Sequence, residues 1–84
     1  MKKDYAIQNL KEAQEHIEEI IEVLEKSRNL EPLKNGYLQA FFNSVYWHIN
    51  SVWNCRNTPQ KVIDNATDDD FDKFCQYPKD VDEY

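Results

Sequence analysis

The fold of this chain depends most on residues 35–56, which read NGYLQAFFNSVYWHINSVWNCR. Apolar residues recur there at steps of three and four, the spacing that keeps side chains on one face of an α-helix. The central stripe consists of Leu38, Phe42, Val45, Ile49 and Val52. Flanking aromatic residues and His48 widen the apolar surface to roughly 180° of the helix, against about 100° for a helix with one buried face. The segment is therefore predicted to be a helix that packs against more than one neighbour.

A second long helix is predicted over residues 3–28, which contain no proline or glycine. Its apolar stripe is formed by Ala6, Leu10, Ala13, Ile17, Ile20 and Leu24, and it is widened by Ile7 and Ile21. Glutamates occupy the opposite face, which we interpret as a solvated surface. The short connector between the two helices favours an antiparallel hairpin. The second helix could begin with Pro32 in its first turn or with Asn35 as its N-cap. Gly36 would weaken a helix interior, so we place the start near Asn35.

Two short helices are predicted after the hairpin, over residues 59–65 and 68–76. Thr67 is a suitable N-cap for the second one, because Asp70 follows three residues later as in a capping box. Residues 79–84 are predicted to be a frayed acidic tail. The expected fold is therefore all-α, a single domain in which a hairpin of two long helices carries two short C-terminal helices. Two hairpins packed face to face would form a four-helix bundle, so we expect a homodimer.

Composition limits the classes of function that this chain can have. A domain of 84 residues has a small core, and a second subunit is one common way to stabilise it. The formal net charge is −6, and no acidic residue occurs between Glu31 and Asp64. Because the chain is acidic and has no basic patch, we expect no direct binding to nucleic acid or to a membrane.

The two cysteines, Cys55 and Cys75, bear on the compartment. The chain begins at Met1 and passes directly into a charged helical pattern, so we expect no secretory signal and a cytoplasmic location. A disulfide between the two cysteines would be unusual in that compartment. For the same reason, the sequon that begins at Asn65 is not expected to be glycosylated.

No catalytic or metal-binding group of residues is predicted. His48 and Cys55 are seven residues apart on one helix, about 10.5 Å along its axis, which is too far for a shared zinc ion or a thiolate pair. A di-iron bundle needs a Glu-x-x-His motif, and the residue three positions before His16 is Ala13. We therefore expect a protein that is not an enzyme and that holds no cofactor.

Trp47 is the residue that best marks a candidate site, because it projects from the side of the second helix opposite the apolar stripe. One interpretation is packing, in which the C-terminal helices cover the indole. The other is a recognition surface with a tryptophan anchor. The predicted interaction surface consists of Trp47, Asn43, Asn50, Asn54 and Arg56.

The function predicted from these features is a small, non-enzymatic or regulatory helical protein that binds another protein. Two alternatives stay open. The first is a metal- or small-ligand-binding bundle that uses His16, His48 or the cysteines. The second is an acidic mimic of nucleic acid, although the acidic residues cluster at the two ends of the chain.

Overall fold

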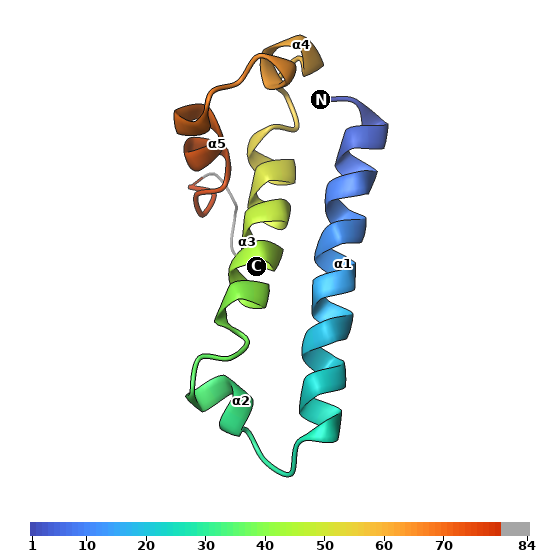
Figure 1. Cartoon of the computed structure of the whole chain (residues 1–84). Helices are drawn as coiled ribbons and strands as arrows, with labels where there is room; N and C mark the ends of the chain where they lie inside the picture. The colour runs from blue at the N-terminus through green and yellow to red at the C-terminus, as the bar shows by residue number, and fades with distance from the viewer. Residues whose placement is uncertain (80–84) are drawn as a thin grey trace.

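The structure is a computed structural model that describes residues 1–79. In this range the two long helices, α1 (Lys3–Lys26) and α3 (Gln39–Asn54), lie side by side as an antiparallel hairpin (Figure 1). The connector contains α2 (Glu31–Lys34), and α4 (Gln60–Asp64) and α5 (Asp68–Phe74) follow α3. The predicted fold class, a helical hairpin with two short helices after it, is confirmed. The acidic tail predicted over residues 79–84 lies, apart from Lys79, outside the described residues.

The second long helix begins four residues later than predicted, because the chain forms a separate helical turn before it. Pro32 lies in the first turn of α2, where its missing N–H needs no partner. Gly36 then adopts φ +77°, a left-handed conformation that ends a helix and that glycine reaches at little cost. Residues 35–38 form the resulting turn, and α3 starts at Gln39.

The ends of the other helices follow local hydrogen bonding. The Ser27 hydroxyl donates to the Val23 carbonyl oxygen (2.9 Å), and α1 ends at Lys26 rather than at residue 28. The Thr67 side chain accepts from the Asp70 N–H (3.3 Å), and the Asp70 carboxylate accepts from the Thr67 N–H (3.0 Å). The predicted capping box at the start of α5 is therefore present, while α4 and α5 are slightly shorter than the predicted 59–65 and 68–76.

The two long helices do not bury the middle of their apolar stripes against each other. On α1 the buried residues are Asn9, Ala13 and Ile20, whereas Leu10 and Ile17 stay largely exposed. Those two exposed residues belong to the apolar stripe predicted for this helix. The helix is thus rotated so that one edge of its stripe contacts α3 and the other edge faces solvent.

The molecule is long and thin, and its core is small. Its extents are 46 × 28 × 25 Å, and its radius of gyration is 14.9 Å, against about 12 Å for a compact domain of this length. The solvent-accessible surface is 6680 Å², about a quarter more than the roughly 5,300 Å² of a typical folded monomer of 10.1 kDa. The buried apolar residues are Ala13, Ile20, Leu38, Cys55 and Ile63. The hairpin alone therefore leaves unusually much surface in contact with water.

Candidate functional site

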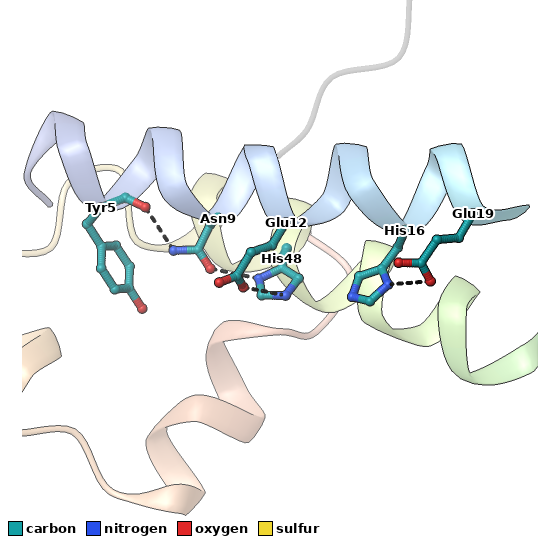
Figure 2. A network of polar contacts seen from close by, with 6 residues as sticks. All are labelled: Tyr5, Asn9, Glu12, His16, Glu19 and His48. Carbon is teal, nitrogen blue, oxygen red and sulfur yellow. Dashed lines mark hydrogen bonds and ion pairs between the residues drawn. The ribbon is translucent and has the colours of Figure 1, made fainter.

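A polar bridge, formed by Asn9 and Glu12 of α1 and His48 of α3, joins the two long helices (Figure 2). His48 Nδ1 lies 2.8 Å from Asn9 Oδ1, and His48 Nε2 lies 3.0 Å from Glu12 Oε2. The Asn9 amide donates to the Tyr5 carbonyl oxygen (2.9 Å), so its own oxygen is directed at the imidazole. Both ring nitrogens therefore face acceptors, and the imidazolium form has a proton to donate to each of them.

His16 lies one turn further along α1 and continues this line of polar residues (Figure 2). Its ring stacks near His48, with 6.5 Å between the ring centroids. Its Nδ1 is buried without a hydrogen bond and lies 3.8 Å from Glu19 Oε2. Within residues 1–79, no group of three or more His, Cys, Asp and Glu side chains comes together in a way that could hold a metal ion. The bridge is thus a polar contact between the two long helices.

The predicted strip around Trp47 lies where α5 packs on the side of α3 away from α1 (Figure 1). The Trp47 ring is 6.2 Å from the Phe71 ring of α5 and 5.1 Å from the ring of His48. Asn50 is buried, and its amide donates to the Cys75 carbonyl oxygen (2.9 Å). A C-terminal helix therefore packs against Trp47, as the packing interpretation expects, and the indole stays partly exposed.

The other members of the predicted strip are divided between this contact and the surface. The Asn54 amide donates to the carbonyl oxygens of Phe74 (2.6 Å) and Gln76 (2.8 Å), at the C-terminal end of α5. The Arg56 guanidinium lies 3.9 Å from the centre of the Trp53 ring, and its Nη1 donates to the Trp53 carbonyl oxygen. Asn43 is exposed. The strip thus contributes to binding α5, and its use as a recognition surface stays a prediction.

Both cysteines are free thiols. Cys55 is buried at the end of α3, and desolvation raises the pKa of its thiol. A thiol in this state is a weak nucleophile, because the thiolate is the reactive form. The Cys75 Sγ donates to the Asp72 carbonyl oxygen (3.2 Å) within its own turn.

The most prominent feature of the hairpin surface is a set of large, partly exposed apolar side chains on both long helices. Each of them is between 38 and 58% exposed. We define the apolar face as Leu10, Ile17 and Ile21 of α1 together with Phe42, Tyr46, Ile49 and Trp53 of α3. The α3 residues follow one another at steps of four, three and four, which keeps them in line along the helix. Exposed apolar residues are normal singly, but a contiguous patch of this kind marks an interaction site.

The two halves of the apolar face lie on the same side of the hairpin. On each long helix, the exposed apolar residues lie roughly 110° around the helix axis from the residues that contact the other long helix. The angle is measured in the direction in which the residue numbers increase. In an antiparallel pair, equal rotations in this sense bring both sets to one side. The acidic residue Glu15 and the α5 contact at Trp47 lie on the other side by the same geometry. The hairpin is thus apolar on one broad side and polar on the opposite one.

A shallow apolar hollow of about 250 Å³ lies in this face. It is lined by Val45, Tyr46, Ile49, Asn50 and Tyr77, so the chain after α5 borders the apolar face. Cavities that bury a small-molecule ligand usually have volumes of about 300–1,000 Å³. The hollow is therefore better suited to one side chain of a protein partner than to a cofactor.

Sequence analysis did not identify the polar bridge, and it predicted a broad apolar arc without indicating which of its residues stay exposed. The signal for the bridge was the position of Asn9, which shares a helix side with Ala13, His16 and Ile20 and is therefore placed to be buried. The signal for the apolar face was the excess width of both apolar stripes. Which edge of each stripe remains exposed depends on how the two helices pack, and this is a tertiary property.

Comparison of the chain with protein-family models, with curated proteins and with solved structures finds no match. Across residues 1–79, none of the helices combines the length and the apolar character needed to cross a membrane. The functional argument therefore rests on the surfaces of this chain itself.

Proposed function

We propose that this protein is a non-enzymatic interaction protein that works by packing its apolar face against another polypeptide chain in the cytoplasm. The observation that carries this proposal is the apolar face, where seven large side chains stay about half exposed on one side of the hairpin. Complete burial of such a side chain contributes about 1.5–3 kcal/mol relative to leaving it in water. A partner that covers the face gains this free energy.

The cytoplasmic location is part of the same proposal. It is supported by two free thiols, one of them only partly buried, in a chain that contains no other cysteine. Thiols stay reduced in the cytosol, whereas secreted small domains usually pair them in disulfides. The hollow in the apolar face is smaller than an ordinary ligand pocket, and α3 carries no acidic residue with which to imitate a nucleic acid. We therefore prefer protein binding to the two alternative functions.

The test places a photoreactive residue on each side of the hairpin. p-Benzoylphenylalanine replaces Ile17 on the apolar face or, as a matched control, Glu15 on the polar side of the same helix. After irradiation in the native cell, we expect position 17 to form covalent adducts with a polypeptide and position 15 to form few or none. Equal yields at both positions, or no adduct at position 17, would contradict the proposed function.

A further inference from the structure

We infer that the partner on the apolar face is a second copy of this chain, with α1 of each hairpin packed against α3 of the other. This inference rests on the proposed function, because it identifies the polypeptide that covers the face. The resulting assembly is a four-helix bundle whose two-fold axis runs parallel to the long helices. Three observations support it: the area of the face, the distribution of charge and the levels of the residues along the helices.

The area of the face matches that of a dimer interface. Seven side chains about half exposed offer roughly 600 Å² on each hairpin, so that a face-to-face dimer would bury about 1,200 Å². This is the lower end of the range for specific protein interfaces. The accessible surface of 6680 Å² exceeds that of a typical folded monomer of this mass by more than the area of the face. Burial of the apolar face would stabilise the fold itself. A second copy of the chain is available for this wherever the chain is made.

Charge decides which helices face each other. The α1 helix is rich in glutamate, and Glu18 and Glu25 lie beside its apolar residues. The α3 helix carries no Asp, Glu, Lys or Arg from Gln39 to Asn54. A two-fold axis perpendicular to the helices would set α1 against α1 and bring the glutamates of two chains together. An axis parallel to the helices sets each acidic α1 against an uncharged α3 and avoids this repulsion.

The levels of the residues along the helices agree with this arrangement. His48 contacts Asn9 and Glu12, which sets the relative height of the two antiparallel helices. Counted from that contact at about 1.5 Å per residue, Ile17 is level with Phe42 and Leu10 is level with Ile49. Rotation about an axis parallel to the helices keeps every residue at its height. Ile17 therefore meets Phe42 of the other copy, and Leu10 meets Ile49, level with the hollow. Ile21 lies beyond Phe42, level with the turn that precedes α3.

The experiment uses this cross-pairing through two variants of opposite charge. Ile17→Lys and Phe42→Glu each place two buried charges in their own homodimer, and either should weaken self-association by at least about thirtyfold. An equimolar mixture is different. The heterodimer has two contacts between positions 17 and 42. One of them pairs the new Lys with the new Glu, and the other is the native contact of Ile17 with Phe42. We expect each variant to be monomeric alone and the mixture to form a dimer by light scattering, with a gain in helical circular dichroism if either variant is partly unfolded.

The matched control mixes Ile17→Glu with Phe42→Glu, which places like charges in the altered half and should remain monomeric. A wild-type dimer whose Ile17→Lys and Phe42→Glu variants do not pair on mixing would overturn the α1–α3 arrangement. A wild-type chain that is monomeric at tens of micromolar would overturn the second copy as the partner. The photoreactive residue at position 17 separates this failure from failure of the proposed function. An adduct of twice the chain mass supports self-association, whereas an adduct only with a different polypeptide contradicts it and leaves the proposed function standing.

Discussion

His48 shows how single residues set the orientation of the whole hairpin. Its two ring nitrogens contact Asn9 and Glu12 on α1, and both contacts require α1 to turn a polar part of its surface toward α3. That rotation removes Leu10 and Ile17 from the contact between the helices and leaves them on the apolar face. The polar bridge and the exposed apolar residues are therefore two consequences of one packing geometry.

Removing one acceptor of the bridge should destabilise the hairpin. We expect Asn9→Ala to lower the free energy of unfolding by about 1–3 kcal/mol, because a mostly buried ring nitrogen of His48 loses its partner. Chemical denaturation measures this, and a double-mutant cycle with His48→Ala isolates the pair. The control is Gln8→Ala on the exposed side of α1, which should change the free energy by no more than about 0.5 kcal/mol. Equal effects of the Asn9 and Gln8 substitutions would show that the bridge does not stabilise the contact between the helices.

At the scale of elements, sequence patterns predicted which segments form helices better than they predicted where each helix begins and ends and how it is oriented. The capping box at Thr67 and Asp70 is a local interaction, and its prediction is confirmed. The extra turn of α2 depends on Pro32 and Gly36 acting together, and the sequence left two positions open for the start of α3. The orientation of α1 depends on His48, which is 39 residues distant from Asn9 in sequence, so no local pattern could predict it. The sequence left two interpretations open for Trp47. The structure packs Phe71 of α5 against the indole, and the use of the strip as a recognition surface stays a prediction.

Gly36 tests the account of the connector. Its backbone φ of +77° is strained for any residue with a Cβ atom, although the nearest atom to an added Cβ, Gln39 Oε1 at 3.7 Å, leaves room. Gly36→Ala should therefore destabilise the fold by roughly 1–2 kcal/mol through backbone strain alone. Gly36→Asn should cost less, because asparagine tolerates this conformation better. If thermal unfolding showed alanine to be as stable as glycine, the turn between α2 and α3 would not have the described conformation.

The docking of α5 should depend on pH through Asp70. Hydrogen bonds from the backbone N–H and the hydroxyl of Thr67 lower the pKa of the Asp70 carboxyl from its ordinary value of 3.8. Since the pKa is lower in the folded than in the unfolded state, ionised Asp70 stabilises the fold above the ordinary pKa. This stabilisation is lost as the pH falls through the lowered value.

Trp47 fluorescence measures this effect, because the indole lies against Phe71 of α5. In a Trp53→Phe background, where Trp47 is the only tryptophan, we expect its emission to shift to the red as the pH falls from 5 to 2. Asp70→Asn should show a red shift already at neutral pH and a smaller further change on acidification. An Asp70→Asn protein with the same acid transition as its parent would mean that other carboxyls control the docking of α5.

At the scale of the whole molecule, the small core and the excess accessible surface support the proposal that contact with another chain stabilises the hairpin. The radius of gyration of 14.9 Å and the accessible surface of 6680 Å² exceed the values for a compact monomer of this size. The sequence predicted, from the width of the apolar stripe of α3, that this helix packs against more than one neighbour. The structure supplies α1 and α5 as two of them, and the apolar face is the part that neither covers.

The most direct test of this account is the mass of the wild-type protein in solution, measured by light scattering over a dilution series. At tens of micromolar we expect twice the chain mass of 10.1 kDa, with helicity that decreases on dilution as the copies separate. A mass of one chain at every concentration, with cooperative unfolding that does not depend on concentration, would show that the hairpin is stable alone and would contradict self-association through the apolar face.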